Sequence, residues 1–192
     1  TLFVNPAQFS PKEDFDAYPR NEDDDRRMFE EAGASLLFAP PIEEIYPAGH
    51  VTKIHVEGLS SLLEGEFRPR FLIGVATVVC KLLIQAMADV AVFGEKDYQQ
   101  LQVIRRMARD LDIPTEILGA PTIREHDGLA MSSRNRYLSE DERPRACALF
   151  SAISEIARAT AEGADPAPLC DAAARQLTEA GFREVDYVTV RD

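Results

Sequence analysis

Short apolar runs alternate along this chain with longer segments of helical periodicity, and this alternation limits the folds that the chain can adopt. Apolar runs occupy residues 35–39, 89–93 and 115–118, whereas residues 72–87 and 97–111 have the length and pattern of helices. One face of the second helical segment collects Leu101, Ile104, Met107, Ala108 and Leu111. Loops follow the carboxyl ends of the apolar runs. This order predicts an α/β fold with a doubly wound, Rossmann-like parallel sheet.

Weaker patterns flank this central part. Asn21 and Gly33 are typical start and stop residues for a helix over residues 22–32. Residues 3–4 are typical of the end of an apolar strand, and residues 51–56 of a more exposed strand. Because the chain opens inside an apolar run, we expect part of the first strand to precede it.

The pattern changes near Thr122, first to a polar loop and then to alanine-rich segments. Residues 139–162 and 167–180 predict helices, and residues 185–190 predict a strand. The second part is therefore expected to be a small α+β domain. We predict two domains, residues 1–122 and residues 123–192.

Charge and cysteine content exclude several classes of partner. Thirty-three acidic against 21 basic residues give the 192-residue chain a formal net charge of −12, which repels phosphate backbones and anionic lipid surfaces. No run approaches the roughly 20 apolar residues of a membrane span. We therefore expect neither a nucleic-acid nor a membrane partner. An odd number of cysteines without C-x-x-C spacing favours a reduced, cytoplasmic chain: Cys80, Cys147 and Cys170.

The first chemical motif reads F-G-E-K-D-Y-Q-Q over residues 93–100, where an apolar run passes through a charged turn into a helix. Gly94 allows close approach of the backbone to a ligand. The free N–H groups of the new helix attract anions, and Lys96 adds a cation. This combination indicates a phosphate site. The alternative is an ordinary strand–turn–helix in which Glu95, Lys96 and Asp97 are solvated capping residues.

Two other motifs supply polar groups. Residues 127–137 place two hydroxyls before two arginines on a glycine-containing loop, which favours bidentate phosphate binding by a loop that is free to close. A polar linker between domains is the alternative. Residues 5–9 present Asn5 and Gln8 at the carboxyl end of a strand, where a small polar substrate can bind. A turn-forming Asn-Pro pair explains that segment equally well.

Taken in order, the three motifs resemble the pantothenate synthetase (pantoate–β-alanine ligase) family along nearly the whole chain. The long matching strings are F-V-N-P-x-Q-F, F-G-E-K-D-Y-Q-Q-L and D-G-L-A-M-S-S-R-N-R-Y-L. Shorter matches are Tyr18-Pro19-Arg20, Ile45-Tyr46-Pro47, Leu62-Leu63-Glu64-Gly65 and Gly74-Val75-Ala76-Thr77-Val78-Val79.

The resemblance implies a nucleotidylyltransferase-type fold, a homodimer and a reaction in two steps. ATP and pantoate would give pantoyl adenylate and pyrophosphate, and β-alanine would then attack the acyl carbon to give pantothenate and AMP. Residues 1–122 would bind nucleotide and pantoate, and residues 123–192 would form a lid. Charge develops on the phosphates in such a reaction, so preorganised cations and N–H donors are needed more than a covalent nucleophile.

The resemblance also implies roles for individual residues. ATP would contact Gly94, Glu95, Lys96, Asp97, Ile123, Met131, Ser132, Ser133 and Arg134, and the catalytic residues among these would be Lys96, Ser132 and Arg134. Pantoate would be held by Asn5, Gln8, Arg68 and Gln100, with Gln8 also near β-alanine.

A magnesium ion would ride mainly on the ATP phosphates. Asp24 and Asp25 match carboxylates to which a metal is assigned in relatives. These two residues lie in a Glu-Asp-Asp-Asp run at a predicted helix start, however, where solvated carboxylates that complement the helix dipole explain them as well.

The chain departs from the family pattern in three places. A Gly-x-x-His-x-Gly-His signature, whose histidines face the triphosphate, lies upstream of Thr1 in the family, so we expect these 192 residues by themselves not to adenylate pantoate. Phe71 stands where the family commonly has a histidine, which removes a hydrogen-bond donor near the substrate. The family's C-terminal domain continues beyond Asp192.

Two other functions fit the same motifs. An enzyme that activates a different small carboxylic acid would keep the phosphate loops and change the acid pocket, and Phe71 favours it. A non-catalytic remnant that binds nucleotide or dimerises would show binding without turnover.

Overall fold

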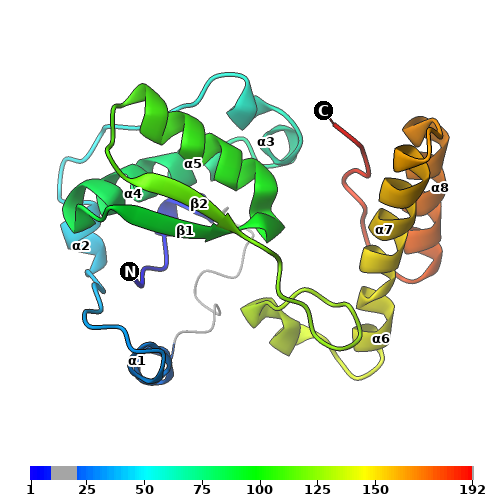
Figure 1. The fold of residues 1–192 in the computed structure, drawn as a ribbon, viewed down its shortest axis with the longest axis horizontal. Coiled ribbons are helices and arrows are strands. Elements are labelled where there is room, and N and C mark those ends of the chain that lie inside the picture. Colours follow the sequence, from blue (N-terminus) through cyan, green and yellow to red (C-terminus); the bar gives the residue numbers. More distant parts are fainter. Residues whose placement is uncertain (10–20, 192) are drawn as a thin grey trace. The chain divides into compact units, whose positions relative to one another are not determined.

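The computed structural model describes residues 1–9 and 21–191, and it divides into two compact units, Thr1–Pro121 (unit 1) and Thr122–Asp192 (unit 2) (Figure 1). The Tyr18-Pro19-Arg20 match lies outside the described residues. The assignment of nucleotide and pantoate binding to the first domain, and of a lid to the second, stays a prediction.

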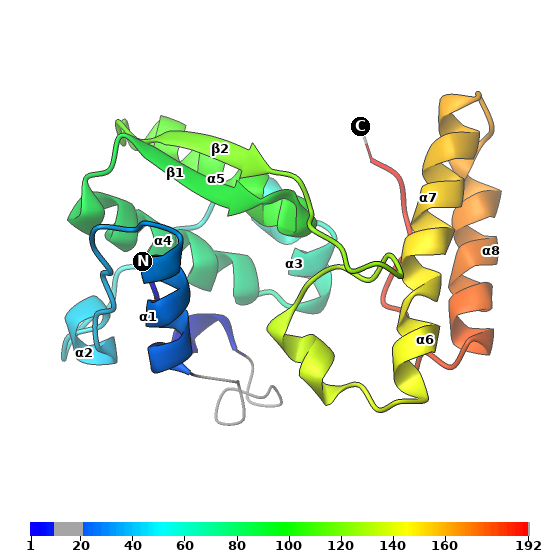
Figure 2. The same ribbon diagram turned by 60° about the horizontal axis from the view of Figure 1, so that its bottom comes forward.

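Unit 1 contains a parallel pair of strands, β1 (Val90–Gly94) and β2 (Glu116–Ala120). Phe93 pairs with Gly119 and Gly94 with Ala120, so both strands end at one edge. Figures 1 and 2 show the two strands running side by side in the same direction, and helix α5 (Tyr98–Asp110) connects them. This β–α–β order confirms the predicted α/β fold with a parallel sheet.

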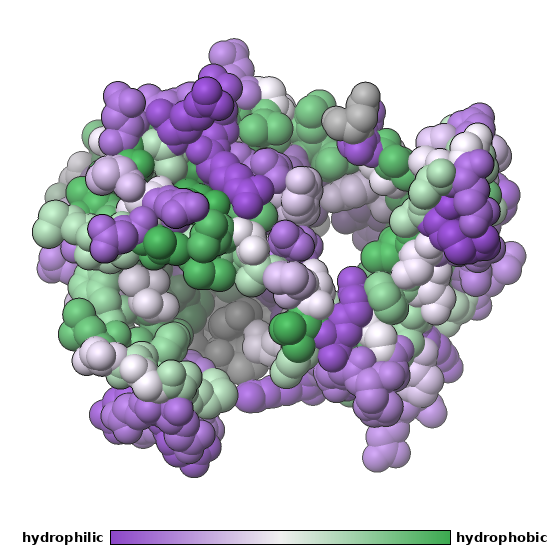
Figure 3. Space-filling view, in the orientation of Figure 1, coloured by the Kyte–Doolittle hydropathy of each residue, from purple (hydrophilic) through white to green (hydrophobic). Residues whose placement is uncertain are grey.

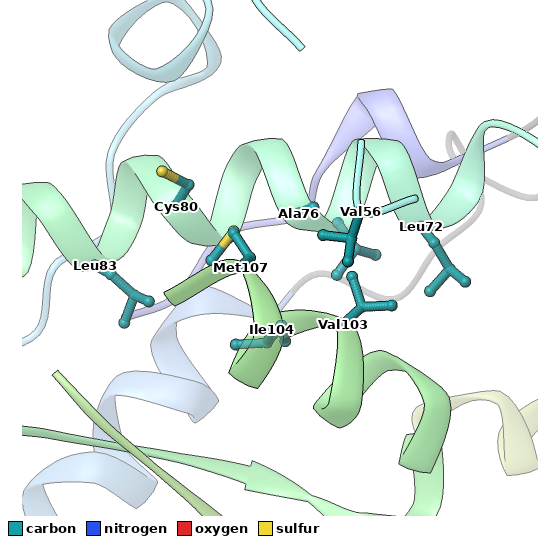
Figure 4. Close-up of a cluster of buried hydrophobic side chains, with 9 residues drawn as sticks. Val56, Leu72, Ala76, Cys80, Leu83, Val103, Ile104 and Met107 are labelled. Atoms are coloured by element: carbon teal, nitrogen blue, oxygen red, sulfur yellow. The ribbon is translucent and has the colours of Figure 1, made fainter. Parts of the chain in front are cut away.

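The core of unit 1 forms where α5 meets helix α4 (Phe71–Ala86) and one face of the strands. Figure 4 shows side chains of α4 pointing toward those of α5. The buried cluster comprises Val56, Leu72, Val75, Ala76, Cys80, Leu83, Val103, Ile104 and Met107. Ala91, Phe93 and Ile117 of the strands pack against this cluster, which fixes the sheet and therefore the turns that leave its carboxyl edge.

The opposite face of the sheet is apolar and open to solvent. Val92 is 64% exposed and Leu118 is 41% exposed, at positions that alternate with the core-facing residues. Figure 3 shows hydrophobic residues, in green, gathered where the two strands lie in Figure 1. Within the described residues, helices therefore cover only one face of the sheet.

Shorter elements complete unit 1. They are the helices α1 (Glu22–Glu31), α2 (Ile42–Ile45) and α3 (Glu64–Phe67) and the 3₁₀ helices η1 (Pro6–Gln8), η2 (Leu59–Ser61) and η3 (Glu95–Asp97). The predicted helix start at Asn21 is confirmed, because the Asn21 side chain accepts a hydrogen bond from the Asp24 N–H (3.4 Å).

Unit 2 is helical in its described residues. The 3₁₀ helix η4 (Ser133–Tyr137) precedes α6 (Glu142–Ala146), α7 (Ala148–Ala161) and α8 (Pro166–Glu179). α7 and α8 form a hairpin whose core is Ala152, Ile156, Cys170, Ala173 and Leu177. The helical segment predicted over residues 139–162 forms two helices in the structure, α6 and α7, which are divided at Cys147. Pro144 lies in the first turn of α6, where the missing backbone N–H costs no hydrogen bond within the helix.

Four predicted strands are wrong. Residues 3–4, 35–39, 51–56 and 185–190 are not strands in the structure. A strand needs a backbone partner, and residues 35–39 have a single such bond among the described residues, from the Leu2 N–H to the Phe38 carbonyl (2.9 Å). Near the C-terminus, Val185 and Val188 pack on the α7–α8 core instead of pairing. An isolated bridge between Arg124 and Ala130 is the only β pairing in residues 122–191.

Within the two described ranges, no helix has both the length and the apolar character needed to cross a membrane.

Candidate active site

The turn that leaves β1, residues 94–97 (the phosphate turn), has the geometry of an anion site. β1 ends at Gly94, η3 covers Glu95–Asp97 and α5 begins at Tyr98, with no side chain capping the start of α5. The buried Leu101 and Ile104 hold α5 in place behind the turn. The first N–H groups of this helix therefore point from a rigid support toward the carboxyl edge of the sheet, where anions bind.

Lys96 has little to hold it within the chain. Its side chain is 44% exposed, and its one ionic contact among the described residues is Asp97 Oδ1, 3.7 Å from Nζ. A contact of this length between exposed neighbours contributes little to stability. The ammonium group is thus available to a ligand.

The fold itself does not require a glycine at position 94. Its φ of −70° and ψ of 135° are open to any residue, and a Cβ built there would have no atom within 4 Å. Close approach of a ligand to the backbone explains a glycine at this position. Gly119 differs, because a Cβ there would lie 2.9 Å from Glu95 Oε1 and 3.0 Å from Leu101 Cδ2. This role of Gly119 was not predicted, although a glycine inside a strand is a signal for such close approach.

Asn5 joins three segments of unit 1. Its Nδ2 donates to Gln8 Oε1 (3.1 Å) and to the Gly74 carbonyl (3.2 Å), and its Oδ1 accepts from the Ala7 N–H (3.2 Å) and the Tyr46 hydroxyl (2.7 Å). Asn5 is only 3% exposed. Its amide therefore orients the partly exposed Gln8 and does more than form an Asn-Pro turn.

Gly74 and Tyr46 make this arrangement possible. A Cβ on Gly74 would lie 2.5 Å from the Ala7 carbonyl oxygen, so only glycine lets η1 approach α4 this closely. Burial raises the pKa of Tyr46 to about 12, against a smaller opposite effect of the Asn5 hydrogen bond. Tyr46 therefore stays a neutral donor to Asn5 at physiological pH.

Arg68 is held from two sides. Its Nη1 donates to Glu64 Oε1 (2.8 Å), and its guanidinium carbon lies 4.0 Å from the centre of the Phe71 ring. The side chains of Arg68 and Glu64 are both about one third exposed. Phe71 cannot donate a hydrogen bond, but here its ring gives the guanidinium a cation–π platform.

Gln99, for which no role was predicted, fastens a neighbouring segment of unit 1 to α5. Its Nε2 donates to the carbonyls of Leu59 (2.8 Å) and Leu62 (2.7 Å), and its Oε1 accepts from the Glu64 N–H (3.2 Å). One side chain of α5 thus fastens the segment that carries Glu64 and, through it, Arg68. Gln100, the predicted pantoate residue, follows on α5 and is half-buried. Residue type alone does not separate the two glutamines, and the prediction for Gln100 came from the family resemblance.

In unit 2, a tight turn precedes residues 131–134 (the serine loop). The Glu125 N–H donates to the Leu129 carbonyl (2.8 Å), and the Leu129 N–H donates to Asp127 Oδ1 (3.1 Å). Gly128 has a φ of +90°, and a Cβ there would lie 2.7 Å from Phe150 Cδ1. The glycine is therefore required by the turn itself.

The serine loop follows the turn directly. The Met131 N–H donates to the Ile123 carbonyl (3.0 Å), and the side chains of both residues are largely exposed. Ser132 Oγ accepts from the Arg134 N–H (3.2 Å) and caps η4, which also contains Ser133. The loop is thus a short capped turn that presents two hydroxyls and an arginine, the groups that bind phosphate oxygens.

The acidic start of α1 does not form a metal cage. Asp24 Oδ1 lies 2.9 Å from Arg27 Nη2, and its Oδ2 accepts from Asn21. Within the described part of the chain there is no group of three or more His, Cys, Asp or Glu that could hold an ion. Asp24 and Asp25 therefore fit the helix-start interpretation, and a metal there stays a prediction.

Comparisons with known proteins agree on one family. The sequence model of the family described as Pantoate-beta-alanine ligase matches residues 1–192. The chain is 58% identical over 195 residues to a pantothenate synthetase from Caulobacter vibrioides, which covers 100% of this chain and 67% of the relative. It is 55% identical over 192 residues to one from Paramagnetospirillum magneticum, at 100% and 68% coverage.

Solved structures agree. A pantothenate synthetase from Thermus thermophilus has a TM-score of 0.83 at 48% identity and covers 93% of this chain and 64% of its own. A pantoate-β-alanine ligase from Francisella tularensis, solved with β,γ-ATP and β-alanine, has a TM-score of 0.82 at 30% identity, with 94% and 66% covered. The chain thus spans about two thirds of the length of the relatives that it matches.

Proposed function

Because the chain belongs to the pantoate–β-alanine ligase family, we propose that the protein joins pantoate to β-alanine with ATP as the energy source. A carboxylate oxygen of pantoate would attack the α-phosphorus of ATP, and pyrophosphate would leave with the electrons of the broken P–O bond. The amine of β-alanine would then attack the acyl carbon of pantoyl adenylate and release AMP. The observation that carries this proposal is the phosphate turn, with its uncapped helix start and exposed Lys96 at the edge of the sheet.

The phosphate turn suits the negative charge that develops in the first step. Gly94 leaves room for phosphate oxygens near the backbone, and the N–H groups at the start of α5 complement their charge. Lys96 would stabilise the transition state at the phosphates. Glu95 and Asp97 would complete the ATP contacts of this turn.

The serine loop would bind the triphosphate through Ser132, Ser133 and Arg134, with Met131 and Ile123 beside the nucleotide. Replacement of Ser132 or Arg134 by alanine should raise KM for ATP more than KM for pantoate. An equal loss for both substrates would contradict this division of roles. Mg²⁺ bound to the ATP phosphates would neutralise part of their charge.

The acid substrate is assigned to polar groups of unit 1. Gln8, oriented by Asn5, and Gln100 would hold pantoate by hydrogen bonds, and Gln8 would also contact β-alanine. Arg68 would attract the carboxylate, supported by Glu64 and Phe71. We further propose that the protein is cytoplasmic and forms a homodimer. Light scattering of the full-length protein at several concentrations tests the dimer.

The test is pantoate-dependent exchange of labelled pyrophosphate into ATP, without β-alanine, by the full-length gene product. This measurement isolates the adenylation step. We expect exchange that requires both pantoate and Mg²⁺. A folded protein that binds ATP but catalyses no exchange would contradict the proposal.

A second candidate is an enzyme that adenylates a different small carboxylic acid, which Phe71 favours because its ring cannot donate a hydrogen bond to the acid. A panel of small hydroxy acids and amino acids in the same exchange assay separates the two candidates. Preference for an acid other than pantoate would replace the proposal. Nucleotide binding without turnover on any acid would indicate a non-catalytic remnant instead.

A further inference from the structure

One arginine of α6 reaches back to the turn before the serine loop. Arg143 Nη2 donates to Glu125 Oε2 (2.6 Å) and to Asp127 Oδ2 (3.0 Å), and its Nε also donates to Asp127 Oδ2 (3.3 Å). The side chains of Arg143, Glu125 and Asp127 are between 26% and 31% exposed. A guanidinium shared by two carboxylates in this way fixes their orientation as well as their charge.

Glu125 passes this constraint on to η4. Its second oxygen, Oε1, accepts from Asn135 Nδ2 (3.0 Å), and the same amide donates to the Ala130 carbonyl (3.0 Å). Asn135 directly follows the serine loop. A chain of hydrogen bonds therefore runs from α6 through Glu125 to the end of that loop, while the Met131 N–H bond to the Ile123 carbonyl holds its beginning.

The charges in this chain of contacts support one another. The hydrogen bond from Arg143 is the largest cause that lowers the pKa of Glu125. The Leu129 N–H, followed by Arg143, lowers the pKa of Asp127 to about 2. Both carboxylates are therefore ionised at neutral pH and accept hydrogen bonds with all their oxygens. Without Arg143 the two like charges would repel each other and release Glu125 from its position.

We infer that Arg143 is a positioning residue for the serine loop: it fixes Glu125, Glu125 holds Asn135, and Asn135 sets the position from which Ser132, Ser133 and Arg134 meet the phosphates. This inference rests on the proposed ATP-binding function. An arginine with a purely structural role would stabilise unit 2 without changing how the protein handles ATP.

The test compares Arg143→Gln with Arg145→Gln in the full-length gene product. Arg145 lies on the same helix and is exposed, so its replacement removes the same charge without touching Glu125. We expect Arg143→Gln to raise KM for ATP about 10-fold or more, because small misplacements of binding groups have large effects, and to leave KM for pantoate and β-alanine unchanged. Amide hydrogen exchange at Met131 and Asn135 should become faster in this variant alone.

Asn135→Ala gives a second route to the same result. It removes the last link while Arg143 keeps both carboxylates, so it should reproduce the change in KM for ATP, and the double variant should be no worse than either single one. If Arg143→Gln does not fold, Asn135→Ala decides alone. The inference would be overturned if Arg143→Gln or Asn135→Ala had the same KM for ATP and the same rates of amide hydrogen exchange as Arg145→Gln.

The two proposals can fail separately. If the wild-type protein shows no ATP-dependent activity, the proposed function fails, and hydrogen exchange of the serine loop still decides whether Arg143 positions it. If the wild-type protein is active and the variants leave KM for ATP and exchange unchanged, the function stands and the positioning role falls.

Discussion

The phosphate turn and the serine loop carry similar chemistry on different supports. The phosphate turn lies between a strand and a helix whose backbones are fixed by the β1–β2 ladder and by the buried face of α5. Its lysine has one long ionic contact among the described residues. The serine loop lies in a segment whose neighbouring turn is held by the side chains of Arg143, Glu125 and Asn135. A binding group can therefore be left uncommitted where regular structure holds the backbone, and needs side-chain bracing where it does not.

The largest expected effect is on kcat, when the Lys96 side chain is removed. Lys96→Ala should lower kcat by about 100-fold or more with little change in thermal stability, because the lost charge acts on the transition state and makes little contact with the fold. Steady-state kinetics and a thermal melt check this result. Lys53→Ala, at an exposed lysine of the same unit, is the matched control and should leave both quantities unchanged. A melted Lys96 variant would mean that the turn is not held by its backbone.

A pair of glycines sharpens the comparison. Gly128→Ala should lower the free energy of unfolding by about 2 kcal/mol, because its φ of +90° strains any other residue and its Cβ would overlap Phe150. Gly94→Ala should keep the stability of the wild type, because no atom lies within 4 Å of the added Cβ. It should weaken ATP binding, because the methyl group would occupy the space proposed for phosphate oxygens. Chemical denaturation and ATP titration of both variants measure the two effects. Equal stability losses would remove the distinction between the two supports.

Gln99 tests whether unit 1 uses bracing away from the phosphate turn. Gln99→Ala removes three hydrogen bonds to the segment of residues 59–64 and should lower the free energy of unfolding by about 2 kcal/mol. Because Arg68 is held through Glu64, KM for pantoate should also rise, whereas KM for ATP should not. Gln102→Ala, on the same helix, is the control. A rise in KM for ATP instead would place Gln99 at the phosphates.

The smallest effect is a pH dependence of the bracing in unit 2. The hydrogen bond from the Leu129 N–H, followed by that from Arg143, lowers the pKa of Asp127 from 3.8 to about 2 in the folded protein. A lowered pKa stabilises the folded state above the unfolded value, and this stabilisation is lost as pH falls toward the folded value. The difference in melting temperature between the wild type and Asp127→Asn should therefore shrink from about pH 5 to about pH 2. A difference that stays constant over this range would contradict the lowered pKa of Asp127.

Local patterns were enough to predict the central elements. The helices α4 and α5 and the strands β1 and β2 lie within one or two residues of their predicted bounds. The helices have a long apolar periodicity, and each short apolar run has the other beside it as a pairing partner. The extended segments were predicted wrongly for one shared reason. An apolar run such as residues 35–39 has the composition of a strand, but it pairs only if a partner backbone lies beside it.

The chemistry of the candidate site follows the same division. The motifs around Lys96 and Ser132 were found in the sequence, because each lies in one short string. The contacts that orient the predicted pantoate residues of unit 1 join residues far apart in the chain. Asn5 bonds to Gly74 across 69 positions, and Gln99 to Leu62 across 37.

The sequence by itself determined the family, the order of the central elements and the set of polar groups available for binding, since these depend on residue identity and short-range spacing. Only the tertiary structure decided which of those groups are already used within the chain. Asn5, Gln99 and Arg143 have polar side chains like those predicted to bind substrates, yet the structure shows that they brace other segments of the chain. Burial and hydrogen-bond geometry make this distinction, and both depend on contacts between distant residues.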